Sequence, residues 1–282
     1  MQTISTKSDL QAALAFGSPR RTVLVPTMGA LHAGHASLLR RARELAGRAG
    51  RVVASVFLNP VQFDNADDLA TYPASPQEDI SLCEACGADI VFMPASEEMY
   101  APDRSMRLEE TSLSTVLCGA RRPGHFAGVC LVVSKLFNLV QPTDAIFGKK
   151  DYQQLVILRR MVRDMDIPVA IHGVEIVREP DGLALSSRNR RLAPEQRAAA
   201  PALRKSLLAA KDAYESGAMA AEICGRVKET LGALPDVRPE YVELVDAETL
   251  RPATEAGRLD LLAAAAWFGG VRLIDNIELQ RS

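Results

Sequence analysis

The sequence predicts an α/β protein built on a doubly wound parallel sheet, followed by a smaller C-terminal α+β domain. Short apolar runs rich in β-branched residues, typical of buried parallel strands, occur at residues 22–26, 52–58, 88–94, 144–148 and 169–177. Amphipathic segments of helix length lie between them, at 36–49, 125–141 and 151–166. This alternation implies right-handed βαβ units, whose sheets bind ligands at the carboxyl ends of the strands.

The chain changes character after residue 178. Residues 193–234 are rich in Ala, Leu, Lys and Glu and predict two helices, while 240–250 and 267–279 predict short strands. The Ala-rich run at 263–266 indicates a packed strand or a helix edge. We therefore expect two domains, 1–176 and 177–282.

Composition argues against several classes of protein. The formal net charge is −2 and the sequence pI is about 6.1, without a long block of like charge, which disfavours binding to nucleic acid. The N-terminal stretch has no long apolar run, so we expect neither a signal peptide nor a membrane span. Five cysteines, an odd number in a chain of this length, suit a reducing compartment, and we expect the protein in the cytoplasm.

Two of the four histidines, His32 and His35, follow the first predicted strand in the run PTMGALHAGH. Three residues apart at a helix start, they share one face beside free backbone N–H groups, which favours an anion site. Gly29 supplies the turn, and Gly34 lets the backbone come close to a ligand. The alternative is two unrelated histidines on the surface or in the core.

Polar residues follow other predicted strands. Asn59 and Gln62, in FLNPVQF, are amides that can bind hydroxyl and carboxyl groups, although an ordinary Asn-Pro turn explains the same residues equally well. Arg122 and His125 lie in a glycine-bearing loop before a helix. They are further candidates for the same edge of the sheet.

The run FGKKDYQQL, at 147–155, ends another strand. Lys150 is placed to meet phosphate, Asp151 can accept from ribose hydroxyls, and Gln154 lies one helical turn on. A charged loop with a capping aspartate is the simpler alternative.

The run SSRNRRL lies just beyond the last predicted strand of the parallel sheet. Two serines and an arginine in it offer donors to a polyphosphate: Ser186, Ser187 and Arg188.

Neither a nucleophile triad nor a Walker sequence is evident. The remaining modes of catalysis are positioning of the reactants and electrostatic stabilisation. Attack of a carboxylate on an α-phosphate requires these two.

Taken in order, PTMGALHAGHASL, FLNPVQF, RPGHFAGV, FGKKDYQQL, DGLALSSRN and RLIDN resemble the pantothenate synthetase family over nearly the whole chain. The resemblance implies a Rossmann-like fold of the H-x-G-H nucleotidyltransferase type, with domain 177–282 as a small lid. It also implies ATP-dependent condensation of (R)-pantoate with β-alanine through a pantoyl adenylate, Mg²⁺ and a homodimer.

The resemblance assigns roles residue by residue. The ATP phosphates or the adenylate would be contacted by His32, His35, Lys150, Ser186, Ser187 and Arg188. The rest of ATP would be bound by Met28, Gly148, Asp151, Val177 and Leu185, with Gly148 and Asp151 at the ribose and Val177 near the adenine. The substrates pantoate and β-alanine would be held by Gln62, Gln154, Met28, Asn59, Tyr72, Arg122 and His125.

The chain departs from the family pattern in places. Ala74 stands where arginine is usual after Tyr72-Pro73, and Leu185 replaces a common methionine with similar volume. Glu78 and Asp79 occupy an acidic stretch that can hold metal in relatives, and they are candidate Mg²⁺ ligands.

Three other interpretations stay open at this point. A plain nucleotidyltransferase would transfer a nucleotide to a phosphate and need no second acceptor. A regulatory or scaffold protein with a decayed site is opposed by the presence of both histidines, Lys150 and Ser186–Arg188 in one chain. An enzyme that charges tRNA is opposed by the absence of a basic face.

Overall fold

In a computed structural model, residues 1–15, 20–253 and 259–280 are described, and they form two compact units. The N-terminal unit comprises residues 1–111, 122–149 and 157–175, and the C-terminal unit comprises 112–121, 150–156 and 176 onward. Among the described residues, no helix is both long and apolar enough to cross a bilayer. The predicted division into domains 1–176 and 177–282 remains a prediction.

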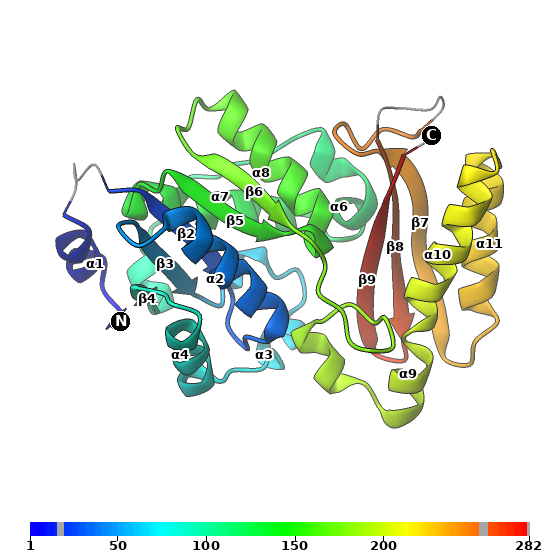
Figure 1. Ribbon diagram of the computed structural model, residues 1–282, viewed down its shortest axis with the longest axis horizontal. Coiled ribbons are helices and arrows are strands. Elements are labelled where there is room, and N and C mark those ends of the chain that lie inside the picture. Colours follow the sequence, from blue (N-terminus) through cyan, green and yellow to red (C-terminus); the bar gives the residue numbers. More distant parts are fainter. Residues whose placement is uncertain (16–19, 254–258, 281–282) are drawn as a thin grey trace. The chain divides into compact units, whose positions relative to one another are not determined.

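A six-stranded parallel sheet organises the N-terminal unit (Figure 1). Its strands are β1 (Gln2–Ile4), β2 (Thr22–Thr27), β3 (Arg51–Val56), β4 (Ile90–Phe92), β5 (Asp144–Gly148) and β6 (Ala170–Val174), in the order β1-β4-β3-β2-β5-β6. All five predicted strands are present. The sheet and its helices confirm the predicted Rossmann-like α/β class.

The strand order reverses beside β2. From β2 the chain runs outward through β3 to β4, and then returns to place β5 on the other side of β2, where Leu24 pairs with Ala145. Such a reversal is a topological switch point, beside which sheets of this type hold their ligands at the carboxyl ends. The carboxyl ends of β2 and β5 lead into the runs that contain His32 and Lys150.

Helices cover both faces of this sheet, which explains why its strands are apolar on both sides. On one face, α2 (Ala33–Ala46) packs on β2, β3 and β5, and α4 (Pro76–Ala85) lies beside it. The core between the sheet and α2 contains Val23, Val25 and Leu39, all of them buried. Helix α7 (His125–Val140) packs on β2 and against α1 (Lys7–Leu14).

Smaller elements lie between the strands of the parallel sheet. They are the 3₁₀ turn η1 (Pro60–Gln62), α3 (Ala66–Ala70), α5 (Ser96–Met99) and η3 (Lys149–Asp151), and helix α8 (Tyr152–Asp164) follows η3.

The cysteines Cys83 and Cys86 are both buried. Burial raises the pKa of the Cys83 thiol to about 12, so this thiol is not a nucleophile at neutral pH.

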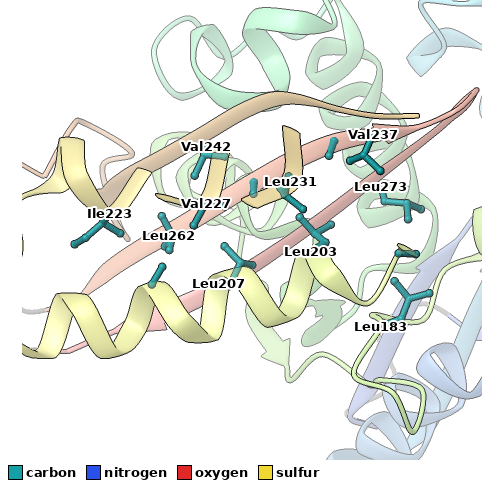
Figure 2. Packing of buried hydrophobic residues seen from close by; sticks show 14 of the residues in the cluster. Leu183, Leu203, Leu207, Ile223, Val227, Leu231, Val237, Val242, Leu262 and Leu273 are labelled. Atoms are coloured by element: carbon teal, nitrogen blue, oxygen red, sulfur yellow. The ribbon is translucent and has the colours of Figure 1, made fainter. Parts of the chain in front are cut away.

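The C-terminal unit has an antiparallel sheet of β7 (Val237–Asp246), β8 (Asp260–Phe268) and β9 (Val271–Leu279), with β8 in the centre. Helices α10 (Ala202–Glu215) and α11 (Ala220–Gly232) pack on it, after η4 (Ser187–Arg191) and α9 (Pro194–Ala199). Their shared core includes Leu207, Val227 and Leu262 (Figure 2). The short segments η2 (Leu113–Thr115) and α6 (Leu117–Arg121) also belong to this unit.

In this half one sequence prediction is wrong and another is confirmed. Residues 267–279 are not one strand, because Gly269 and Gly270 turn the chain between β8 and β9. The Ala-rich run at 263–266 lies in the central strand β8, where each alanine is buried. Small side chains fit there because both neighbours pair with β8 and the sheet is covered.

Asp144, at the first position of β5, is 4% exposed and accepts two hydrogen bonds from the Arg21 guanidinium, at 2.8 and 2.7 Å. His172 Nε2 lies 2.8 Å from the same carboxylate. The hydrogen bond from Arg21 holds the pKa of Asp144 well below its ordinary value, although burial opposes the shift. These contacts lie at the amino end of β5, opposite the carboxyl edge of the sheet.

We predict that Asp144→Asn lowers the free energy of unfolding at pH 7 by about 1–3 kcal/mol, at the lower end because Arg21 is half-exposed. The folded pKa lies below the unfolded value of 3.8, so this stabilisation is present above that pH and is lost as the pH falls below it. Urea unfolding at pH 7 and pH 3 measures the difference, which should shrink at pH 3. The exposed pair of Arg41 and Glu44 provides a control, since Glu44→Gln should change little at either pH.

Candidate functional site

The turn after β2 is held by a buried carboxylate. Asp79 on α4 is 2% exposed, and its two oxygens accept the backbone N–H groups of Ala30, at 3.0 Å, and Leu31, at 2.7 Å. Gly29 has φ +88°, and a Cβ there would lie 3.0 Å from Asp79 Oδ2, so both the backbone conformation and the close contact favour glycine. Asp79 thus fixes the backbone that delivers the histidine pair to α2.

His32 and His35 cap the start of α2 reciprocally. His32 Nδ1 accepts from the N–H of Gly34 at 3.1 Å, and His35 Nδ1 accepts from the N–H of His32 at 3.2 Å. The two rings lie 4.1 Å apart between centroids. A neutral imidazole that accepts at Nδ1 carries its proton on Nε2, so both rings are donors at Nε2. The predicted anion-binding pair is therefore assembled at a helix start.

Gln62, at the end of η1, is oriented by Asn59. The Asn59 amide donates to Gln62 Oε1 at 2.9 Å and to the Gly128 carbonyl at 3.1 Å. With its oxygen engaged, Gln62 directs its Nε2 donor toward Met28, whose Sδ lies 2.9 Å away. Gln62 can accordingly offer N–H donors to a carboxylate or hydroxyl.

Tyr100 fixes the orientation of Asn59. Its hydroxyl donates to Asn59 Oδ1 at 2.8 Å, and burial raises the pKa of this hydroxyl to about 12, so it stays a donor at neutral pH. Asn59 is 1% exposed and bonded on both sides of its amide, which suits a role in positioning Gln62. Tyr100 was missed in the sequence, where it lies far from the other motifs.

Helix α7 packs closely against η1. A Cβ on Gly128 would lie 2.6 Å from Gln62 Cα and from the Val61 carbonyl oxygen, so only glycine permits this approach. His125, 9% exposed, has Nδ1 2.8 Å from the Gln62 carbonyl oxygen. Residues of the RPGHFAGV run thus hold Gln62, in FLNPVQF, in place.

Arg122 is tied to the same group of residues. Its Nε donates to Asp64 at 2.9 Å, and its Nη1 lies 3.3 Å from His125 Nε2. Tyr72 packs edge-on against Phe63, with 5.9 Å between ring centroids. Ala74 and Glu78 are exposed.

Neighbouring lysines after β5 have different surroundings. In the N-terminal unit, Lys149 Nζ forms an ion pair with Glu175 at 2.6 Å. A Cβ on Gly148 would meet no atom within 4 Å, so open space lies beside its backbone. In the C-terminal unit, Lys150 Nζ lies 3.9 Å from the exposed Asp151, and the Lys150 carbonyl accepts from Asn276 at 3.0 Å.

The two glutamines of FGKKDYQQL also differ. Gln153 is 6% exposed, and its amide is bonded to the Leu113 and Val116 carbonyls and to the N–H of Cys118. Gln154 is half-buried. Gln153 is therefore structural, and Gln154 remains the predicted ligand contact of the pair.

The DGLALSSRN run forms a turn closed by backbone bonds. Leu185 donates its N–H to the Val177 carbonyl at 3.0 Å, and Ser186 caps η4 by accepting from the N–H of Arg188 at 3.3 Å. Ser187 is buried. Asn189 donates to Glu179 at 2.9 Å and to the Ala184 carbonyl at 3.1 Å. These two bonds connect η4 to the residues that precede it in the turn.

Within the N-terminal unit, the structure thus brings together Met28, Asn59, Gln62, Arg122 and His125 through a chain of contacts, and it assembles His32 with His35. Asp79 was proposed as a metal ligand, and its two oxygens are engaged by backbone amides instead. The roles assigned to individual residues in binding substrates remain predictions.

The parallel sheet, its switch point and the histidine pair define a Rossmann-like protein of the nucleotidyltransferase type. Comparisons with known proteins agree. The sequence model described as Pantoate-beta-alanine ligase matches residues 2–278. A Pantothenate synthetase of Akkermansia muciniphila is 58% identical over 281 residues, which is 99% of this chain and 100% of the relative.

Solved structures give the same result. A Pantothenate synthetase from Thermus thermophilus superposes with a TM-score of 0.92 at 46% identity, over 98% of this chain and 99% of that one. A Pantoate-beta-alanine Ligase from Francisella tularensis, complexed with Beta-gamma ATP and Beta-alanine, has a TM-score of 0.81 at 30% identity, over 98% and 97% of the two chains. The chain belongs to the pantoate–β-alanine ligase family.

We predict that capping and phosphate binding can be separated at the histidine pair. Asparagine caps helices well, and glutamine at the third helical position reaches back in a capping box, so His32→Asn and His35→Gln should keep the free energy of unfolding within about 0.5 kcal/mol. Each replaces the imidazole Nε2–H by an amide N–H in a different position, so pyrophosphate exchange into ATP should fall about 100-fold or more.

His32→Ala is the matched comparison, expected to lose about 1 kcal/mol of stability as well as activity. Full activity in His32→Asn and His35→Gln would leave the histidines with capping as their only role. Urea unfolding and the exchange assay on the same preparations decide the point.

Proposed function

We propose that this protein condenses (R)-pantoate with β-alanine in an ATP-dependent reaction that passes through a pantoyl adenylate. The observation that carries the proposal is the pair of Nε2 donors of His32 and His35 at the sheet's switch point, in a chain that belongs to the pantoate–β-alanine ligase family. The complex of the Francisella tularensis protein with an ATP compound and β-alanine supports two of the three substrates.

The chemistry needs two successive displacements. The pantoate carboxylate attacks the α-phosphorus of ATP, pyrophosphate leaves, and a mixed anhydride of pantoate and AMP forms. The amine of β-alanine then attacks the acyl carbon, the C–O bond to AMP breaks, and the amine loses a proton as the amide forms. Both steps depend on orientation of the reactants and on stabilisation of charge at the phosphates.

Donors on the described residues suit the phosphate charge. We assign contacts with the phosphates or the adenylate to His32, His35, Lys150, Ser186, Ser187 and Arg188, and the remaining contacts with ATP to Met28, Gly148, Asp151, Val177 and Leu185. The open space beside Gly148 supports its place at the ribose. Imidazole, ammonium, hydroxyl and guanidinium groups are all hydrogen-bond donors that phosphate oxygens accept.

Pantoate is assigned to Gln62 and Gln154, with Met28 against its dimethyl group. The oriented Nε2 of Gln62 supports this role, because pantoate presents a carboxylate and hydroxyls as acceptors. Asn59, Tyr72, Arg122 and His125 complete the proposed binding region for pantoate and β-alanine. The contacts of Asn59 and His125 with Gln62 favour positioning as their contribution.

Mg²⁺ is proposed to arrive with ATP. Among the residues that the structure describes, no group of three or more His, Cys, Asp or Glu side chains could hold a metal ion. Asp79 is engaged by backbone amides and Glu78 is exposed, a donor set that does not fit a protein-held site. Mg²⁺ needs few protein ligands when phosphates and water supply the rest, and it would neutralise phosphate charge.

We also propose a cytoplasmic homodimer. All five cysteines are free, which is compatible with a reducing compartment. The dimer rests on the family resemblance, and light scattering of the purified protein tests it.

A plain nucleotidyltransferase is the competing function, and one assay separates the two. We predict that exchange of labelled pyrophosphate into ATP requires pantoate, and that adding β-alanine yields pantothenate with AMP in equal amounts. Exchange without pantoate, or turnover that releases ADP, would contradict the proposal.

The orientation of Gln62 gives a further prediction. In Asn59→Asp the carboxylate cannot donate to Gln62 Oε1 and accepts from Nε2 instead, so Gln62 turns its oxygen toward pantoate. The KM for pantoate should rise about tenfold, the scale of one lost hydrogen bond, while the KM for ATP changes less than about twofold.

Asn65→Asp is the matched control for this prediction. Asn65 is exposed and caps α3 through its Oδ1, which an aspartate can replace, so the same change of charge should leave both KM values unaltered. Equal effects of the two variants would show that added charge, and not the orientation of Gln62, is responsible.

A further inference from the structure

Strand β9 carries adjacent polar residues that are both buried. Asp275 is 3% exposed and Asn276 is 6% exposed, within the RLIDN run. Successive side chains of a strand point to opposite faces of a sheet, so these two residues serve different faces. Burying two polar side chains in sequence is unfavourable unless each is hydrogen-bonded, and both are.

Asp275 anchors the base of the turn that leads to Ser186. Its two oxygens accept from the Arg178 guanidinium at 2.7 and 2.9 Å, and one also accepts from the N–H of Asn276 at 2.8 Å. A bidentate arginine–carboxylate pair fixes orientation as well as distance. Arg178 also donates to the Gly182 carbonyl at 3.0 Å, across the turn.

The same turn has an apolar anchor. Leu183 is buried in the core of the C-terminal unit and lies at one end of the cluster shown in Figure 2. Arg178 forms a backbone bridge with Ala184, and η4 packs on β9. Position and direction of Ser186–Arg188 therefore depend on β9 through Asp275.

Asn276 anchors the backbone at Lys150. Its Nδ2 donates to the Lys150 carbonyl at 3.0 Å, and two residues along the strand Glu278 accepts from the Tyr152 hydroxyl at 2.9 Å. The peptide unit after Lys150 is planar, so holding its carbonyl also holds the N–H of Asp151. All of these residues belong to the C-terminal unit.

We propose that Asp275 and Asn276 are positioning residues that hold Lys150 and Ser186–Arg188 in one fixed frame for the phosphates of ATP. The inference rests on the proposed function, which assigns those two segments to ATP. Neither residue is itself expected to contact a substrate. RLIDN takes its importance from linking two segments that are far apart in sequence.

ATP affinity tests this inference, measured by isothermal titration so that no turnover is needed. Asn276→Ala should weaken ATP binding about fivefold, the scale of one hydrogen bond that holds a ligand group in place. In Asn276→Asp a carboxylate faces the Lys150 carbonyl, so a larger loss is expected. Asp275→Asn, which breaks the bidentate pair with Arg178, should also weaken ATP binding.

A double-mutant cycle separates positioning from a general loss of structure. If Asn276 acts through Lys150, Asn276→Ala should add less than about twofold to the effect of Lys150→Ala, because the two changes remove one interaction. Asp275→Asn should be non-additive with Arg188→Ala in the same way. Additive effects in both cycles would overturn the proposal.

Glu240 and Arg272 provide the matched control. This half-buried ion pair, at 2.6 Å, joins β7 to β9 in the same sheet. Burial alone would raise the pKa of Glu240, but the hydrogen bond and charge of Arg272 more than offset it and lower the pKa. Glu240→Gln should therefore reduce stability and leave ATP affinity within about twofold.

Thermal unfolding of every variant completes the experiment. Equal losses of ATP affinity in Glu240→Gln and in the Asn276 variants would show that any damage to this sheet has the same effect, which would also overturn the proposal. Failure of the wild-type protein to bind ATP would instead overturn the proposed function. The two failures are thereby distinguished.

Discussion

The reversal of strand order between β2 and β5 is the constraint on which the rest of the N-terminal unit depends. Chains leaving two neighbouring parallel strands toward opposite sides of a sheet cannot cover the edge between them, so backbone N–H groups and polar side chains there stay accessible to ligands. The PTMGALHAGH run leaves β2 at this point, and FGKKD leaves β5. Buried partners such as Asp79 then hold the turn in place without entering the ligand region.

Neighbouring residues of the same type differ in the hydrogen bonds and ion pairs that they form. Lys149 is paired with Glu175, whereas the backbone of Lys150 is held by Asn276. The amide of Gln153 is hydrogen-bonded to backbone groups, whereas Gln154 is half-buried. In each pair one residue has a side-chain partner in the fold, and the other is the one to which the proposed function assigns a ligand contact.

The histidine pair caps a helix and, in the proposed function, also binds phosphate. Accepting backbone N–H groups at Nδ1 stabilises the start of α2, and the same bonds determine which nitrogen carries the proton. Local structure and the proposed phosphate contacts would therefore depend on one set of hydrogen bonds. The family's H-x-G-H spacing follows, because only residues at the cap and the third helical position can reciprocate in this way.

Much of the fold was accessible from sequence because buried parallel strands and amphipathic helices have distinct periodicities. All five predicted strands of the main sheet are present, and α2, α7 and α8 lie where their apolar spacing indicates. Strand β1 was missed because Gln2–Ile4 has only one apolar residue. The full extent of β8 was missed, although its Ala-rich run indicated a packed strand or a helix edge, because alanine has little preference for strands outside a covered sheet.

The sequence by itself determined the class of fold, the strand ends that carry polar residues, and the family. Only the tertiary structure decided which partners orient those residues. Tyr100 reaches Asn59, Asp79 reaches the turn before α2, and Asn276 reaches Lys150 across 126 positions of sequence. The reason is physical: periodicity and capping are local properties of a chain, whereas the hydrogen-bond partner of a buried polar group is chosen by packing.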